Sequence, residues 1–303
     1  MKEEFTIEVI NSVSELHRIL SLPKPFHPLI TLINHNDVKT IDSQERQRIV
    51  LNFYNISIKK SFQGQFKYGK NYYDFDEGIM SFVGPNQVIA IDEDENRNKD
   101  GWSLLFHPDL IRNYPLGKSI KNYGFFAYEV HEALHLSDEE EKLIENLIRN
   151  IQKEYQSRVD NFSQDVIVSN LELLINYCNR FYNRQFVTRR MASTDLLSKF
   201  ESALSNYFND NLKTGLPTVT ILAKQLNVSP SYLSDMLRNV TGQNTQQHIH
   251  NKLIEKAKDI LITTNMTVSE IAFQLGFEHS QSFNKLFKSK NGISPLKFRN
   301  SFN

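Results

Sequence analysis

The feature that most constrains this chain is an internal repeat near its C-terminus. The segment TVTILAKQLNVSPSYLSDMLRNVTG (218–242) aligns with TVSEIAFQLGFEHSQSFNKLFKSKNG (267–292), with one additional residue in the second copy. The aligned pairs include Val219 with Val268, Ala223 with Ala272, Gln225 with Gln274, Leu226 with Leu275, Leu233 with Phe283, Leu237 with Phe287 and Gly242 with Gly292. A repeated pattern of this kind predicts that one supersecondary unit is built twice.

Each copy predicts a helix, a tight turn and a second helix. Asn227 and Gly276 stand at the turn of their copies, and Asn and Gly tolerate a left-handed backbone better than other residues. Ala223 and Ala272 precede the turn, at the point where two helices cross closely. A larger side chain at either alanine would push the helices apart.

Capping residues place the ends of these helices. In the first copy Ser229 is an expected N-cap, and Pro230 fits the first helical position. In the second copy Thr267 and Glu270 form a capping box that begins the first helix. The residues expected to form the buried face of the second helix in the first copy are Leu233, Met236, Leu237 and Val240.

The other face of the second helix is polar in both copies. Its residues are Ser231, Tyr232, Ser234, Asp235 and Arg238 in the first copy, and Ser280, Gln281, Ser282, Asn284 and Lys285 in the second. In the major groove, Gln and Asn pair with adenine and Lys and Arg with guanine, so we expect base contacts here. The cations expected near the phosphate backbone are Lys288, Lys290, Lys297 and Arg299.

The distribution of charge agrees with a phosphate-bearing partner. The 303 residues carry 35 basic and 35 acidic side chains. From Lys213 to the C-terminus, however, 11 Lys and Arg oppose 5 Asp and Glu, a net charge of +6, so the first 212 residues carry −6. A basic C-terminal third on a neutral chain favours binding to nucleic acid.

The stretch ILITTNMTVSEIAFQLGFEHSQSFNKLFKSKNGISPLKFR (260–299) resembles the signature of AraC/XylS-type transcriptional regulators. The matching residues are Ile271-Ala272, Gly276-Phe277, Phe283, Phe287-Lys288, Gly292, Ser294-Pro295 and Phe298-Arg299. The resemblance covers about Leu196 to Phe302. One position departs from the family, since many members carry Arg where this chain has Leu253, with Lys252 beside it.

The resemblance implies two helix-turn-helix units joined by one long helix at about 246–262, with both recognition helices in successive major grooves. It also implies a cupin-like N-terminal β-barrel followed by dimerisation helices. The partners that it implies are double-stranded DNA, RNA polymerase, a small-molecule effector and a second copy of the chain.

The first half of the chain predicts strands. Between about 26 and 125 there is no helical period, and short β-rich runs alternate with Gly, Pro and Asn. The runs are 25–34, 48–58, 78–92 and 101–111. This spacing indicates an antiparallel sandwich or barrel.

Two helices are expected after the strands. Ser137 and Glu140 form a capping box, and a second helix at about 163–183 follows. Its apolar face comprises Val166, Val168, Leu171, Leu173, Leu174, Tyr177 and Phe181. Such a face either lies against the strands or pairs with another subunit. The segment 184–195 has no apolar period and predicts a linker.

One motif points to an enzyme. His131, Glu132 and His135 satisfy H-E-x-x-H, the pattern of zinc proteases. That chemistry needs both histidines on one face of a helix and a third protein ligand. Because the capping box begins a helix only after the motif, we expect residues 131–135 in a strand or loop, and we do not assign zinc proteolysis.

Other candidate side chains have simpler interpretations. His17, His27, His35 and His107 do not form a cupin metal motif, so ordinary polar histidines are expected. The aromatic residues expected to form a barrel core rather than a ligand cage are Phe53, Tyr54, Phe62, Phe66, Tyr68, Tyr72, Tyr73, Phe75 and Phe82. The single cysteine, Cys178, is expected to be a small apolar helix residue, and it excludes an internal disulfide.

The sequence therefore predicts an α+β protein of three parts. Residues 1–183 form a cupin-like sensing and dimerisation domain, 184–195 a linker, and 196–303 an AraC-type DNA-binding domain. We expect a cytoplasmic, homodimeric transcriptional regulator with no catalytic, metal or cofactor site, no membrane segment and no secretory leader. The alternative is a barrel enzyme or metal-binding cupin with an accessory helical domain. Activation and repression both remain open.

Overall fold

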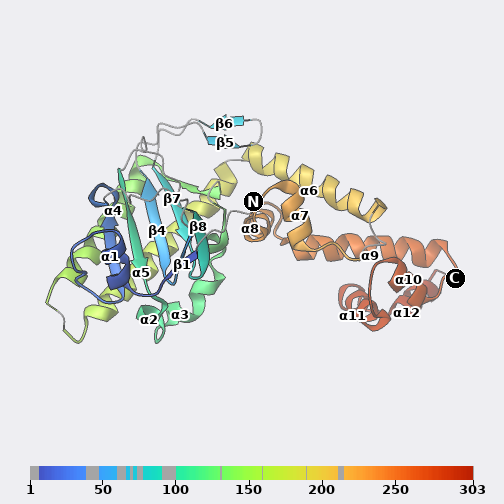
Figure 1. Cartoon of the computed structure of the whole chain (residues 1–303). Helices are drawn as coiled ribbons and strands as arrows, with labels where there is room; N and C mark the ends of the chain where they lie inside the picture. The colour runs from blue at the N-terminus through green and yellow to red at the C-terminus, as the bar shows by residue number, and fades with distance from the viewer. Residues whose placement is uncertain are drawn as a thin grey trace, which may run out of the picture. The chain divides into compact units, whose positions relative to one another are not determined.

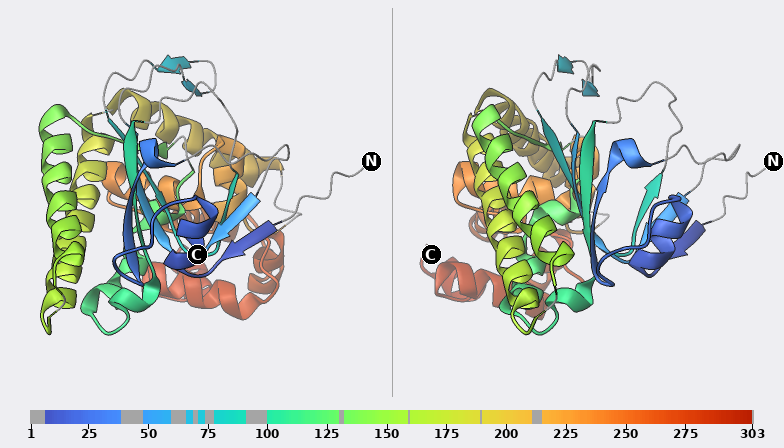
Figure 2. Two further views of the ribbon diagram at one scale, coloured as in Figure 1. Left: turned by 60° about the vertical axis from the view of Figure 1, so that its left-hand side comes forward. Right: turned by 90° about the vertical axis from the view of Figure 1, so that its left-hand side faces the viewer.

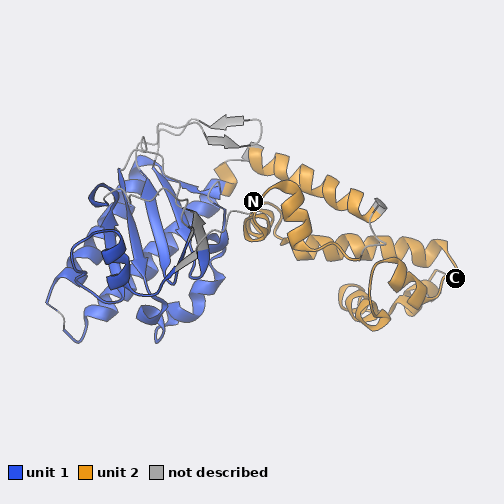
Figure 3. Cartoon of the chain, viewed as in Figure 1, with its two compact units in different colours: residues 1–185 blue, residues 186–303 orange. Residues whose placement is uncertain are grey.

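A computed structural model describes residues 7–38, 48–59, 66–68, 71–73, 78–90, 100–129, 132–158, 160–188, 190–210 and 215–302 (Figure 1). The chain divides into two compact units, residues 1–185 and 186–303 (Figure 3). Unit 1 contains the strands and unit 2 is helical.

The main sheet of unit 1 has five strands in the order β10-β7-β4-β9-β2. Every neighbouring pair in this sheet is antiparallel. Its strands are β2 (Ile30–Asn34), β4 (Tyr54–Lys59), β7 (Ile79–Val83), β9 (Gly101–Phe106) and β10 (Leu134–His135). The inward side chains of the two central strands are fully buried, as Ile56 and Leu104 illustrate.

A second sheet has the order β1-β3-β8, comprising β1 (Ile7–Ile10), β3 (Arg48–Leu51) and β8 (Gln87–Ala90). A third sheet pairs β5 (Phe66–Tyr68) with β6 (Asn71–Tyr73). Helix α1 (Val13–Ile19) packs with the second sheet and one face of the main sheet. The core at this contact comprises Ile10, Val13, Leu16, Ile33, Ile49, Leu51, Phe53 and Leu105.

Two long helices cover the other face of the main sheet (Figure 2). They are α4 (Asp138–Gln156) and α5 (Ser163–Thr188). The Tyr155 hydroxyl on α4 accepts a hydrogen bond from the Leu32 backbone N–H of β2 at 3.2 Å. On α5, Tyr182 contacts Phe82 of β7, with ring centroids 5.8 Å apart. Most of the apolar face of α5 is thus occupied within unit 1.

Short helical segments complete unit 1. They are η1 (His35–Asp37), α2 (Pro108–Ile111), α3 (Pro115–Ser119), η2 (Ile120–Asn122) and η3 (Gly124–Ala127). Buried Phe125 and Phe126 of η3 pack against Phe82 on β7.

The expectation of an all-antiparallel sandwich or barrel holds only in part. β1 pairs with β3 in parallel, because α1 and β2 separate the two strands along the chain and return it in the same direction. Among the described residues, the five-stranded sheet ends at β10 and β2 and does not close on itself. Unit 1 is therefore a mixed-sheet region with flanking helices.

The segment 184–195, expected as a linker, is helical wherever it is described. Helix α5 continues to Thr188, and α6 begins at Arg190. Residues such as Arg, Met and Ala favour helix without any apolar period, so the missing period did not indicate a loop. The capping box before α4, in contrast, is present as predicted, with Ser137 Oγ accepting from the Glu140 N–H at 3.4 Å.

Unit 2 consists of consecutive helices. They are α6 (Arg190–Asp210), α7 (Val219–Leu226), α8 (Pro230–Thr241), α9 (Thr245–Thr263), α10 (Val268–Gln274), α11 (Ser280–Asn291) and α12 (Pro295–Asn300). The boundaries of α7–α8 and α10–α11 follow the sequence repeat, so each copy forms one helical pair.

Candidate nucleic-acid interface

The turn of the first copy follows the residue types predicted for it. Asn227 ends α7 in the left-handed region with φ 56°. The Val228 N–H donates to the Ala223 carbonyl at 3.0 Å. Ser229 then caps α8 by accepting from the Tyr232 N–H at 3.1 Å. These bonds confirm the predicted helix, turn and helix.

The second copy repeats this geometry with a tighter turn. Gly276 has φ +88°, and a Cβ placed there would lie 2.8 Å from the carbonyl carbon of Gly215. Only glycine fits this close approach. The Thr267–Glu270 capping box is present, and Ala223 and Ala272 are fully buried where their helices cross.

Helix α9 joins the two pairs. It spans Thr245–Thr263, close to the predicted 246–262, and begins with a capping box of Asn244 and Gln247. Leu253, the departure from the family pattern, is buried in the core of unit 2. Leu253 therefore contributes to the hydrophobic packing of unit 2.

Arg299 does not lie where it was expected. Its Nε donates to the Leu261 carbonyl near the end of α9 at 2.9 Å, and the side chain is half-buried. A cation at the C-terminus of a helix stabilises the unpaired carbonyls there. Arg299 therefore closes α9 and is not a free cation for phosphates.

On the second helix of each copy, α8 and α11, three residues at matching positions of the repeat form an outward row. In α11 these residues, Gln281, Lys285 and Lys288, are all exposed. In α8 they are Ser231 and Asp235, which are half-buried, and Arg238, which is exposed. Arg238 Nη1 lies 3.1 Å from Asp235 Oδ1, and their side chains are 57% and 26% exposed. The row of α11 is thus cationic, while that of α8 is neutral and internally paired.

Several predicted site residues on α8 turn toward the protein. The Tyr232 ring lies edge-on to Phe186, with centroids 5.3 Å apart. Ser234 Oγ lies 3.0 Å from the hydroxyl of buried Thr245. Val240, expected in the buried face, lies in the last turn of α8 and is 41% exposed.

On α11, Asn284 is half-buried and its Nδ2 donates to the Ser280 carbonyl at 3.0 Å. Ser280 is half-buried at the start of the helix, while Ser282 is exposed. The structure therefore keeps Gln281, Ser282, Lys285 and Lys288 together on the surface.

Lys290, one of the cations expected near the phosphate backbone, lies in the last turn of α11. Its Nζ donates to Asn251 Oδ1 on α9 at 3.1 Å. Asn251 Nδ2 in turn donates to Gln243 Oε1 at 2.8 Å. Asn251 and Gln243 had no signal in the sequence, because a polar residue on the flank of an amphipathic helix looks like an ordinary solvated position.

Two histidines on α9 have lowered pKa values. Burial lowers the pKa of His248, and the Glu201 carboxylate opposes this shift. Burial and the Lys290 ammonium both lower the pKa of His250. Both rings are therefore biased toward the neutral form in unit 2.

The H-E-x-x-H segment does not form an α-helix where it is described. His131 lies outside the described residues, while His135 is in β10 and is buried. The Glu132 carboxylate accepts from the Glu129 N–H at 2.7 Å. Within the described ranges, no group of three or more His, Cys, Asp or Glu is placed to hold a metal ion.

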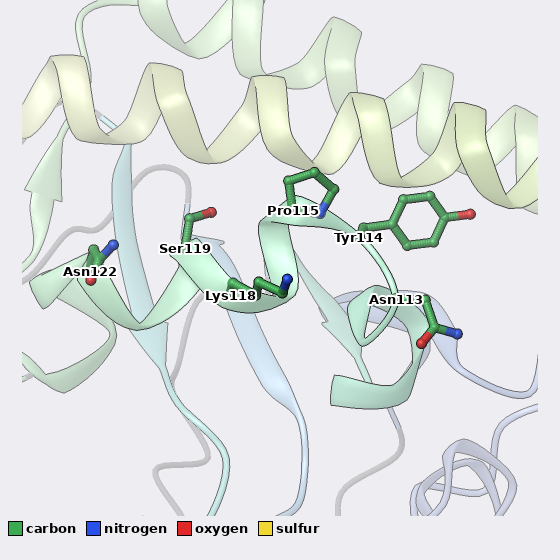
Figure 4. A pocket seen from close by; sticks show the side chains of 6 residues that line it. All are labelled: Asn113, Tyr114, Pro115, Lys118, Ser119 and Asn122. Carbon is green, nitrogen blue, oxygen red and sulfur yellow. The ribbon is translucent and has the colours of Figure 1, made fainter.

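Unit 1 has an open pocket of about 450 Å³ beside α3 (Figure 4). Its lining residues are Asn113, Tyr114, Pro115, Lys118, Ser119 and Asn122. The amide, hydroxyl and ammonium groups suit a polar small molecule.

No helix in the described part of the chain is long and apolar enough to cross a bilayer.

Comparisons with known proteins bear on unit 2. A family model described as a helix-turn-helix domain matches residues 222–301. The raffinose operon transcriptional regulatory protein of Pediococcus pentosaceus is 32% identical over 138 residues, covering 45% of this chain and 48% of that protein. The arabinose operon regulatory protein of Salmonella typhimurium is 29% identical over 120 residues, covering 38% of this chain and 43% of that protein.

Among solved structures, the C-terminal domain of the response regulator yesN from Fusobacterium nucleatum is 32% identical. That match covers 33% of this chain and 96% of the solved domain, with a TM-score of 0.30. The chain spans less than half the length of the two operon regulators. Both are operon regulators by name. Residues 222–301, with their repeated helix-turn-helix geometry, therefore match the helix-turn-helix domain family, and the chain is similar over part of its length to the two operon regulators.

Proposed function

We propose that this chain binds a specific duplex DNA sequence through α8 and α11 and thereby regulates transcription in the cytoplasm. The observation that carries the proposal is the pair of outward rows at matching positions of the repeat, Ser231, Asp235 and Arg238 on α8 and Gln281, Lys285 and Lys288 on α11. A helix supported by a partner helix presents such side chains to base edges in the major groove.

The exposed polar residues contact different parts of the DNA. Gln281 and Lys285 contact bases, since their side chains are exposed and carry amide and ammonium donors. Lys288 and Lys297 contact phosphates, which fix position without selecting sequence. On α8, Arg238 contacts DNA after exchanging Asp235 for a base or phosphate partner, so this helix contributes less electrostatic affinity.

The partners beyond DNA are part of the same proposal. Unit 1 mediates homodimerisation and senses a small-molecule effector, for which the pocket beside α3 offers polar groups. RNA polymerase is the partner through which bound protein changes transcription.

The experiment that tests the proposal is selection of duplexes from a random-sequence pool by the full chain. A recurring sequence motif is expected, bound at least about a thousandfold more tightly than random duplex. Affinity should fall steeply with salt, because bound cations release counterions from the phosphates. Equal affinity for selected and random duplexes would contradict sequence-specific regulation.

A further inference from the structure

The side-chain amide of Asn251 is bonded to both halves of unit 2. Its Nδ2 donates to Gln243 Oε1 at 2.8 Å, and its Oδ1 accepts from Lys290 Nζ at 3.1 Å. Gln243 directly follows Gly242, which ends the first recognition helix α8. Lys290 lies in the last turn of the second recognition helix α11. One residue of the joining helix α9 therefore connects the C-terminal ends of both.

The Gln243 side of this connection is held firmly. The Gln243 N–H donates to Thr241 Oγ1 at 3.2 Å, and Thr241 Oγ1 lies 2.8 Å from His248 Nε2 on α9. The hydroxyl of Thr241 also donates to the Leu237 carbonyl of α8 at 2.8 Å. Gln243 is thus fixed both to α8 and to the first half of α9.

The Lys290 side is held by the core beneath α11. Phe283 and Phe287 of α11 are fully buried, so the backbone carrying Lys290 is anchored. Asn251 itself is half-buried on α9, whose core residues include Ile249 and Leu253. The buried apolar residues hold the helices together, and the polar bonds of Asn251 join the C-terminal ends of α8 and α11.

We propose that Asn251 is a positioning residue that, through Gln243 and Lys290, sets the angle between α8 and α11. That angle fixes the number of base pairs between the two DNA segments they contact. The inference rests on the proposed function. Both bonds require a side chain that carries a donor as well as an acceptor, as the asparagine amide does.

Spacing is a sensitive readout of this angle. B-DNA completes a turn in about 10–10.5 base pairs, so one inserted base pair rotates the second groove by roughly 35° about the axis. A rigid pair of helices cannot follow that rotation without losing contacts. Without the two hydrogen bonds of Asn251, α8 and α11 can follow that rotation in part.

The test compares three duplexes made from the motif that the full chain selects. One has the selected spacing between its two halves, one has a base pair inserted and one has a base pair removed. The wild type should bind the altered duplexes at least about tenfold more weakly, equivalent to one poorly matched segment. Asn251→Ala should keep its affinity for the selected spacing within about threefold and reduce the spacing penalty to about threefold or less.

Lys290→Met removes the same connection from the other side and should reduce the spacing penalty equally. Lys288→Met is the matched control, since Lys288 lies on the exposed row of the same helix. That change should weaken binding to all three duplexes and lower the salt slope by about one unit, with the spacing penalty intact.

A full tenfold penalty in both Asn251→Ala and Lys290→Met would overturn the role of Asn251 while leaving the proposed function standing. Loss of the penalty in Lys288→Met as well would also overturn it, because any loss of charge on α11 would then have the same effect. If the full chain selects no motif, the proposed function fails, and this inference fails with it.

Discussion

At the scale of single residues, His248 couples the stability of unit 2 to pH. Its Nε2 lies 2.8 Å from Thr241 Oγ1, and its ring lies edge-on to Phe200 with centroids 5.5 Å apart. Burial lowers the pKa of His248 below its usual 6.5, against the opposing effect of Glu201. The folded state therefore binds fewer protons than the unfolded state as pH falls through this range. The stability that His248 contributes is present above about pH 6.5 and is lost below it.

We expect the free energy of unfolding of the full chain to fall between pH 7 and pH 5. His248→Gln keeps a hydrogen-bonding group for Thr241 without a titrating ring, so the variant should lose less stability over the same interval. Denaturant unfolding at both pH values measures the difference. An equal loss in both proteins would contradict the role given to His248. His250→Gln is the companion variant, since burial and Lys290 lower the pKa of His250 too.

Gln281 and Asn284 both carry side-chain amides, but the amide of Gln281 is exposed and that of Asn284 is hydrogen-bonded within α11. Gln281→Ala should cost about 1–3 kcal/mol on the selected duplex, with little change on random DNA. Asn284→Ala should cost less, because the Asn284 amide already donates to the Ser280 carbonyl. Titration of both variants on both duplexes gives the comparison. Equal losses on selected and random DNA would show that α11 acts only through charge.

At the scale of elements, the end of α5 belongs to the helical unit. Phe186 is buried against Tyr232 of α8, and its carbonyl accepts from buried Ser193 Oγ at 3.0 Å. A fragment of residues 190–303, which the predicted linker would favour, lacks this aromatic contact. Burial of a large apolar side chain contributes about 1.5–3 kcal/mol.

We therefore expect the fragment 186–303 to unfold at a higher temperature than the fragment 190–303. Phe186→Ala in the longer fragment should remove most of the advantage, which distinguishes the ring from the added length of helix. Thermal unfolding followed by circular dichroism measures all three. Identical midpoints for the two fragments would show that the contact with Tyr232 adds nothing.

Elements with strong local signals were predictable from the sequence. Asn227, Gly276 and the caps at Ser229 and Thr267 fix helix ends through bonds to residues a few positions away. The positions of these helix ends therefore follow from residues that are close in the sequence. The exposure of Gln281, Lys285 and Lys288 on α11 was predictable for the same reason.

Features that depend on distant contacts were not predictable. The run 48–58 appeared as one strand, but it divides into β3 and β4 at Asn52, whose N–H donates to the Ile10 carbonyl at 3.0 Å. The parallel pairing of β1 with β3 likewise depends on where the chain returns. The inward turn of Ser234 required the position of Thr245, and the bond from Lys290 required that of Asn251.

At the scale of the whole molecule, dimerisation remains a prediction, and the structure changes how it is tested. Leu173 on α5 is 45% exposed, whereas Leu174 is fully buried in unit 1. Phe162, at the approach to α5, and Val166 on the helix are exposed as well. A charge at Leu173 therefore probes the surface, while a charge at Leu174 disrupts the core.

We expect Leu173→Lys to lower the sedimentation mass from dimer to monomer at micromolar concentration, with circular dichroism unchanged. Leu174→Lys should lose helical signal, because a buried unpaired charge is strongly destabilising. A wild-type chain that sediments as a monomer would contradict dimerisation, and an unaffected dimer in Leu173→Lys would exclude this part of α5 from the interface.

The central claim is that both copies of the repeat contact DNA, one on each of two successive major grooves. Chemical footprinting of the full chain on its selected duplex tests this claim most directly when wild type, Arg238→Ala and Gln281→Ala are compared. Two protected major-groove segments about 10 base pairs apart are expected. Arg238→Ala should weaken protection of one segment and Gln281→Ala that of the other. A single protected segment, weakened equally by both changes, would contradict the account.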